Sequence, residues 1–217
     1  MASGTRRDEQ VRATRKALLD AAERLFAEYG VYAIANRQIS EAAGQGNNTA
    51  VTYHFGTKAD LVRALVRTHA EQIETIRTGM LAGIGDSSEL RDWVDCSVRP
   101  VTRHLEELGR PSWYARFIAQ VTADPALYAI AEEEFYAASP SLTRLEEGLT
   151  RCVPELPERV RAERALMTMH LIVQMSVDRE RALADTTHTP RATWQDAATG
   201  LVDALVALWR APVTRQP

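Results

Sequence analysis

The sequence is poor in several features that define other classes of protein. It has only two cysteines in 217 residues, Cys96 and Cys152, and each stands in an apolar helical pattern. We therefore expect no disulfide framework, and a reducing, cytoplasmic setting is favoured. Apolar runs without charge stay well short of 18 residues, so we expect no membrane span. The first ten residues, MASGTRRDEQ, lack the apolar core of a signal peptide.

Motifs of enzymes and of cofactor sites are also missing. The chain has no glycine-rich phosphate loop, no Cys/His spacing typical of a metal site and no nucleophile motif. We therefore expect no catalytic activity, no cofactor and no metal. His69 and His104 are isolated in helices dominated by charge, and Glu132–Glu134 is expected to be a solvated charged face.

The sequence does contain helical periodicity along almost its whole length. Apolar residues recur every three or four positions, and no strand alternation or internal repeat interrupts them. This pattern predicts an all-α fold of about nine helices. We expect a head domain at residues 1–57, with a basic arm at 1–13, and a helical body domain at 58–217. Residues 1–70 hold ten basic against seven acidic residues, and residues 71–217 hold sixteen against twenty-two. An anionic partner at the head end fits this asymmetry.

The segment AAGQGNNTAVTYHFGTKADL, residues 42–61, carries the most specific signal. It predicts two short helices, 37–43 and 49–54, joined by a glycine-rich turn and followed by a long helix from residue 58. This order is typical of a helix-turn-helix. Only Ala50 and Val51 are apolar on the inner face of the second short helix. Its outer face is polar, as expected of a helix that enters the major groove of DNA.

Residues 14–62 resemble the DNA-binding head of TetR-family transcriptional regulators, on the strength of ALLDAAERLFAEYG, RQISEAAG and YHFGTKADL at fixed spacing. The turn, Gly-Gln-Gly-Asn-Asn, is one residue longer than is usual, and Thr52 replaces a common tyrosine. The resemblance implies that Lys58, Tyr53 and His54 bind phosphates and that Asn48, Thr49 and Thr52 face bases. Arg37 and Gln38 would touch the backbone or a groove edge. With Asn47 on the same outer face, the predicted DNA-binding residues are Arg37, Gln38, Asn47, Asn48, Thr49, Thr52, Tyr53, His54 and Lys58. The alternative is a solvated charge for Arg37 and a purely structural role for Tyr53, His54 and Lys58.

The last two helices predict a homodimer. The segment from Ala165 to Val177 has no charge and is apolar in every direction, so it must be covered on all sides. The final helix, 192–210, has apolar groups on two faces. Two such helices from each of two chains would form a four-helix bundle, and the resemblance implies the same interface. A two-fold dimer would bind a palindromic operator on double-stranded DNA.

A small-molecule effector of unknown identity is expected among the middle helices. Candidate lining residues are Trp93, Trp113, Arg116, Phe117, Tyr128, Met167, His170 and Gln174. Ordinary core packing is the alternative for each aromatic residue and for Met167, and His170 and Gln174 could instead hydrogen-bond across the dimer. The sequence thus predicts a repressor that a small molecule releases from its operator. The alternatives are a constitutive DNA-binding or architectural protein and a helical enzyme.

Overall fold

The structure is a computed structural model that describes residues 2–187 and 189–214, with side chains from Arg7 onward. All regular secondary structure in these residues is α-helical, which confirms the predicted fold class. The helices are α1 (Ala2–Tyr29), α2 (Asn36–Ala42), α3 (Ala50–Phe55), α4 (Lys58–Ile84), α5 (Leu90–Leu108), α6 (Tyr114–Thr122), α7 (Pro125–Ala137), α8 (Leu142–Cys152), α9 (Glu158–Ala184) and α10 (Trp194–Arg210). The described part has ten helices, one more than expected, because Ser139 and Pro140 separate α7 from α8. None of these helices is long and apolar enough to cross a bilayer.

The chain divides into two compact units. The head unit comprises Met1–Thr68 and Arg116–Phe135, and the body unit comprises His69–Ala115 and Tyr136–Pro217. Helix α4 contributes residues to both units, whereas most of α6 and most of α7 belong to the head unit. A functional boundary at residue 57 stays a prediction.

Helix α1 is longer than the sequence pattern suggested. It begins at Ala2, so the segment predicted as a separate arm, 1–13, is helical wherever the structure describes it. Arginine, glutamine, glutamate and alanine are good helix formers, and no proline or glycine follows Gly4 before the helix ends. Met1 and the side chain of Arg6 lie outside the described residues.

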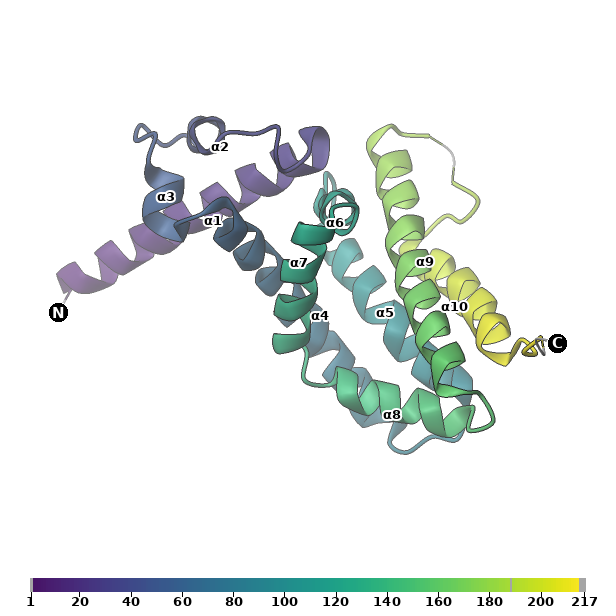
Figure 1. Cartoon of the computed structure of the whole chain (residues 1–217). Helices are drawn as coiled ribbons and strands as arrows, with labels where there is room; N and C mark the ends of the chain where they lie inside the picture. Colours follow the sequence, from purple (N-terminus) through teal and green to yellow (C-terminus); the bar gives the residue numbers. More distant parts are fainter. Residues whose placement is uncertain (1, 188, 215–217) are drawn as a thin grey trace. The chain divides into compact units, whose positions relative to one another are not determined.

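The head unit is built on the buried face of α1. Leu18, Ala22 and Phe26 are fully buried, and α2 and α3 lie beside this helix (Figure 1). Gly30 ends α1 with a φ of 85°, a conformation that glycine adopts without strain, and its N–H donates to the Phe26 carbonyl at 2.9 Å. Phe117 of α6 stacks on Phe26 with ring centroids 6.3 Å apart.

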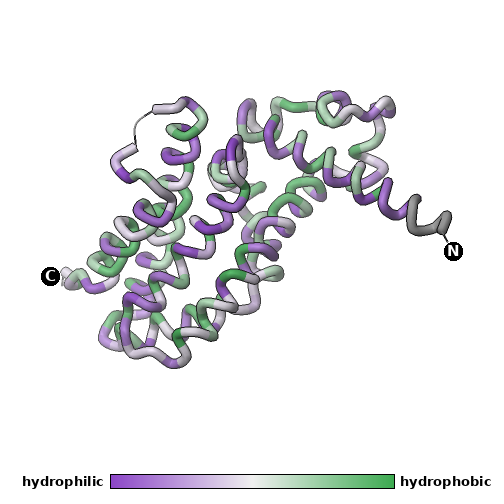
Figure 2. The backbone as a smooth tube through the Cα atoms, turned by 180° about the vertical axis from the view of Figure 1, so that it is seen from behind, coloured by the Kyte–Doolittle hydropathy of each residue, from purple (hydrophilic) through white to green (hydrophobic). Residues whose placement is uncertain are grey.

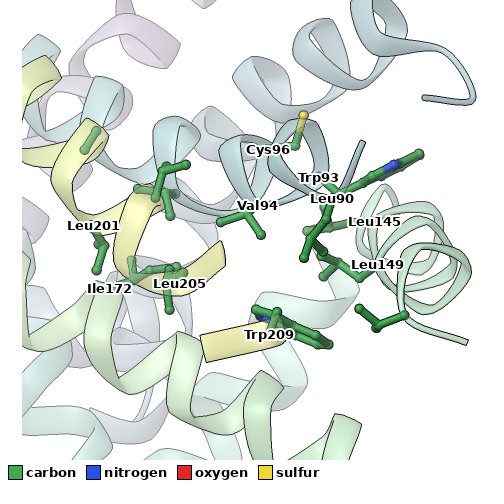
Figure 3. Packing of buried hydrophobic residues seen from close by; sticks show 14 of the residues in the cluster. Leu90, Trp93, Val94, Cys96, Leu145, Leu149, Ile172, Leu201, Leu205 and Trp209 are labelled. Atoms are coloured by element: carbon green, nitrogen blue, oxygen red, sulfur yellow. The ribbon is translucent and has the colours of Figure 1, made fainter. Parts of the chain in front are cut away.

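The body unit has its own apolar core, in which α5 packs against α8, α9 and α10. Figure 3 shows this cluster, with Trp93 and Leu90 of α5 near Leu149 of α8, and with Trp209 from α10. Trp93 is completely buried, and its indole N–H donates to the Ser87 carbonyl at 2.9 Å. Along the backbone, hydrophilic and hydrophobic positions alternate on most helices (Figure 2), as amphipathic packing requires.

Candidate functional site

Helix α3 presents mostly polar side chains to solvent. It has six residues, and only Ala50 and Val51 are buried. Asn48, Thr49 and Thr52 are exposed, and the side chain of Tyr53 is 80% exposed. Because the exposed groups include amide, hydroxyl and phenol donors, α3 has the chemistry that base edges and phosphates require.

The start of α3 is fixed by Asn47. Its Oδ1 accepts hydrogen bonds from the backbone N–H of Thr49 at 2.9 Å and from the Thr49 hydroxyl at 2.7 Å. Asparagine commonly closes a turn in this way. The side-chain oxygen of Asn47 therefore has a structural role in the turn. Asn48, the next residue, is exposed.

The end of α3 is held from α1. Gly56, with a φ of 83°, donates its N–H to the Thr52 carbonyl at 2.9 Å. Arg15 Nη1 donates to the His54 carbonyl at 2.6 Å, and its guanidinium carbon lies 4.3 Å from the centre of the Phe55 ring. The half-buried His54 ring lies edge-on to Tyr53, with centroids 5.0 Å apart.

Arg15 was not among the predicted DNA-binding residues. A signal for its role exists in the sequence, because Arg15 precedes Leu18 by three residues and Ala22 by seven and so lies on the core-facing side of α1.

The start of α2 is capped by its own third residue. Ala35 occupies the cap position, and the side-chain Oε1 of Gln38 accepts the N–H of Ala35 at 2.8 Å. Arg37 forms an exposed ion pair with Glu41, with Nε and Oε1 2.7 Å apart. Both predicted DNA-binding residues of α2 are thus on its exposed side, and their contact with DNA stays a prediction.

Lys58 is turned toward the connection between α1 and α2. Its ammonium nitrogen donates to the carbonyls of Val31 at 3.0 Å and Ile34 at 2.5 Å. Partial burial lowers the pKa of Lys58 below its ordinary value. The structural role that was the alternative for Lys58 therefore has direct support in its contacts, and a phosphate contact for Lys58 stays a prediction.

The start of α4 is capped beside Lys58 by Thr57 and Asp60, which bond each other's side chains and backbone N–H groups. These bonds lower the pKa of Asp60.

The predicted effector residues have different surroundings within each unit. In the body unit, Trp93 belongs to the core, while Met167, His170 and Gln174 are exposed on α9. In the head unit, Phe117 is buried against Phe26, and the Tyr128 hydroxyl donates to Glu132 at 3.1 Å. Trp113 and Arg116 are half-buried.

Two surface depressions occur elsewhere. One, of about 450 Å³, lies by Arg110 and Thr187 in the body unit. The other, of about 270 Å³, lies by Tyr32 and Asp124 in the head unit. Neither is lined by a predicted effector residue, so the effector site stays a prediction.

A buried histidine pair was missed by the sequence analysis. His69 of α4 and His104 of α5 are both buried, and Nδ1 of His69 lies 2.7 Å from Nε2 of His104. The ring of Tyr114 stacks on that of His69, with ring centroids 4.0 Å apart. Burial, with a smaller contribution from the charge of His69, lowers the pKa of His104 to about 4. The two histidines are therefore not isolated.

The acidic run on α7 is not wholly solvated either. Glu134 is buried, and its Oε1 lies 2.5 Å from Nε of Arg67. A buried carboxylate needs such a partner, so the expectation of a solvated face is wrong for this residue. Among the described residues, no group of three or more His, Cys, Asp and Glu side chains is arranged to hold a metal ion.

Several of the buried side chains of α9 are polar or charged. Its buried face includes Arg164, Thr168, Ser176 and Arg179. Arg164 donates to the carbonyls of Trp209 and Ala211, each at 2.5 Å. Arg179 donates at 2.8 and 3.0 Å to the carbonyls of the segment before α10. The inward side of α9 is therefore tied to α10 through these polar groups as well as through the apolar core that Ile172 joins.

The outward side of α9 is apolar. Leu166, Met167, Leu171 and Met175 have exposed fractions of 48%, 50%, 36% and 53%. They recur at spacings of one, four and four residues and form one stripe, which we call the α9 stripe. His170 and Gln174 lie in the same stripe, where Gln174 donates to Asp178 at 3.3 Å. Exposed apolar surfaces of this kind are typical of interaction sites, and a role for this one stays a prediction.

Comparison with known families agrees with this architecture. Residues 18–65 match the profile described as "Bacterial regulatory proteins, tetR family". Residues 95–207, more than half of the chain, match "Tetracyclin repressor-like, C-terminal domain". The chain belongs to the TetR family.

Individual relatives of this TetR-family chain are distant. It is 33% identical over 86 residues to the HTH-type transcriptional repressor AcnR of Corynebacterium efficiens, which is 37% of this chain and 45% of that protein. It is 30% identical over 151 residues to the HTH-type transcriptional dual regulator CecR of Shigella flexneri, or 64% and 65% of the two chains. The chain thus spans less than half the length of AcnR. A solved TetR-family structure from Shewanella sp. PV-4 has 15% identity and a TM-score of 0.62, covering 90% of this chain and 95% of that one. This last likeness supports the fold alone.

Proposed function

We propose that the protein is a transcriptional regulator that binds double-stranded DNA as a homodimer and leaves its operator when a small molecule binds. The observation that carries the proposal is the surface of α3. A short helix with two small buried residues, with exposed hydroxyl and phenol groups, and with the exposed amide of Asn48 just before its start suits a major groove about 12 Å wide. Membership of the TetR family supports the same function.

The α9 stripe supports the dimer. A second copy would cover Leu166, Met167, Leu171 and Met175 with its own stripe, because a two-fold interface pairs a surface with itself. Exposed positions on α10 include the small residues Ala204 and Ala207, which leave room for a partner helix. Two α3 helices would then address half-sites one helical turn, about 34–36 Å, or a multiple of it apart on a palindromic operator.

Regulation by an effector completes the proposal. A ligand that prefers one conformation of the body would shift the dimer away from the DNA-binding arrangement, with a typical coupling of about 1–3 kcal/mol, or roughly 5- to 150-fold in affinity. Trp113, Arg116 and Tyr128 stay candidates for contact with it, and His170 and Gln174 fit better in the dimer interface, where their neighbours on α9 are apolar. A constitutive DNA-binding protein without an effector is the second candidate.

Selection of bound fragments from genomic DNA by the purified protein tests the proposal. We expect enrichment of one palindromic sequence, and a mixture no different from the input would refute it. The Tyr53→Ala variant should bind the selected duplex about tenfold more weakly, because one hydrogen bond to a charged phosphate is lost. Tyr29→Ala is the matched control, since Tyr29 is also an exposed tyrosine of the head unit but lies at the end of α1. An equal effect of the two substitutions would contradict the role given to α3.

A further inference from the structure

The orientation of α3 cannot come from α3 itself. Isolated helices shorter than about 12 residues are marginal in water, and α3 has six residues with only Ala50 and Val51 buried. Two small apolar side chains offer little resistance to rotation or sliding of the helix on its support. The contacts at its two ends must therefore fix its direction.

The two ends are held differently. The start of α3 is held locally, by the turn that Asn47 closes. At the other end, Arg15 reaches across from α1 and donates to the His54 carbonyl at 2.6 Å. Carbonyls of the last turn have no partner within the helix, and a cation there also interacts favourably with the helix dipole.

Arg15 makes a second contact with the same end of α3. Its guanidinium lies 4.3 Å from the centre of the Phe55 ring, within the range of a cation–π interaction. A planar guanidinium can bond a carbonyl and cover an aromatic face at the same time, whereas a lysine ammonium acts as a point charge. One side chain of α1 thus grips both the backbone and an aromatic ring at the end of α3.

Neighbouring basic residues of α1 have a different environment. Lys16 has a side chain that is 75% exposed and pairs with Asp20 at 2.6 Å on the same helix surface. Arg15 is half-buried against α3. Its charge is thus directed into the head unit, which sets it apart from a solvated basic residue.

We propose that Arg15 is a positioning residue that sets the angle of α3 in the groove and so determines how well the protein distinguishes its operator from other DNA. The proposal rests on the DNA-binding function proposed above. Base contacts depend on the placement of α3, whereas phosphate contacts tolerate small shifts and carry little sequence information. Loss of Arg15 should therefore weaken operator binding more than it weakens binding to unrelated DNA.

The test compares full-length wild type, Arg15→Gln, Arg15→Lys and the control Lys16→Gln. Lys16→Gln makes the same change in net charge at the next residue of α1 but leaves the contact of Arg15 with α3 intact. Each protein is titrated at several salt concentrations with the selected operator and with a scrambled duplex of equal length. We expect Arg15→Gln to reduce the ratio of the two affinities about tenfold or more, with the control unchanged. Arg15→Lys should show an intermediate ratio.

Salt dependence separates positioning from a direct phosphate contact. A phosphate-binding arginine, when removed, lowers both affinities alike and reduces the slope of log affinity against log salt by about 0.9. We expect the slope of Arg15→Gln to equal that of Lys16→Gln. An unchanged affinity ratio, or an equal loss on both duplexes with a reduced slope, would overturn the proposal. If Arg15→Gln does not fold by circular dichroism, Arg15→Lys carries the same comparison. A wild type that binds no duplex refutes the DNA-binding function itself. If the wild type and Arg15→Gln both bind the operator and distinguish it equally well from the scrambled duplex, only this inference is refuted.

Discussion

Replacement of Gly148 by alanine should destabilise the protein, although alanine is the better helix former. Gly148 lies inside α8, and its open side is filled by the indole of Trp93. A methyl group at Gly148 would lie 2.1 Å from Cε3 and 2.3 Å from Cδ2 and Cζ3 of Trp93. Carbon atoms in contact prefer about 3.5–4.0 Å, so the ring would have to move by more than 1 Å or α8 would have to shift.

The size of the effect follows from two opposing contributions. Alanine in place of a helical glycine stabilises by about 1 kcal/mol. Overpacking a core costs about 1–3 kcal/mol, and the indole cannot yield easily because it is fully buried and its N–H is bonded to the Ser87 carbonyl. Loss of that bond costs about 1 kcal/mol more. We expect a net loss of about 2 kcal/mol, which is a fall of about 4–8 °C in the melting temperature for a chain of this size.

Gly79 provides the matched control. It lies inside α4, and a methyl group there would meet no atom within 4 Å. Gly79→Ala should therefore raise the free energy of unfolding by up to about 1 kcal/mol. Thermal and urea unfolding of both variants, followed by circular dichroism, should give shifts of opposite sign. A Gly148→Ala protein as stable as the wild type would refute the packing described for Trp93.

Two further predictions concern the polar groups inside each unit. Lys58→Met keeps the aliphatic stem but leaves the carbonyls of Val31 and Ile34 without their donor, so the free energy of unfolding of the head should fall by about 1–3 kcal/mol. An unchanged midpoint of urea unfolding, together with a weaker salt dependence of DNA binding, would instead show a phosphate contact. The pKa of His104 is about 4 in the folded state against 6.5 in an unfolded chain, so the unfolded state takes up the proton first as the pH falls. The stability that His104 contributes is therefore complete above about pH 6.5 and is lost as the pH falls toward 4. The wild type should lose about 2 kcal/mol more than His104→Gln between pH 7.5 and 5, and parallel profiles in urea unfolding would count against the buried pair.

Local signals explain what the sequence could predict. Gly30 and Gly56 adopt positive φ values at the ends of α1 and α3, as glycine does readily at a helix end. The short helix predicted at 49–54 is observed at Ala50–Phe55. Such features depend on a few neighbouring residues. The charge-free segment of α9 likewise predicted a helix with an apolar surface left over, and the α9 stripe is that surface.

Contacts between distant residues explain what it could not. His69 and His104 are 35 residues apart and meet only because α4 and α5 pack together. Glu134 is buried by its pairing with Arg67, 67 residues away, and Arg15 lies 39 residues before the carbonyl it binds. Periodicity shows which side of a helix is buried, but it does not show which polar group on another helix will be its partner.

The central claim is that two copies, joined through the α9 stripe, place two α3 helices in one duplex. Sedimentation of the protein with its selected duplex, for wild type and for Met167→Glu/Met175→Glu, tests it most directly, since burial of a carboxylate in an apolar interface is strongly unfavourable. We predict that the wild type is a dimer with two chains on each duplex, and that the variant is folded, monomeric and unable to retain the operator at moderate salt. A wild type that is monomeric and indifferent to every duplex at low salt, or a variant that remains a DNA-binding dimer, would contradict it.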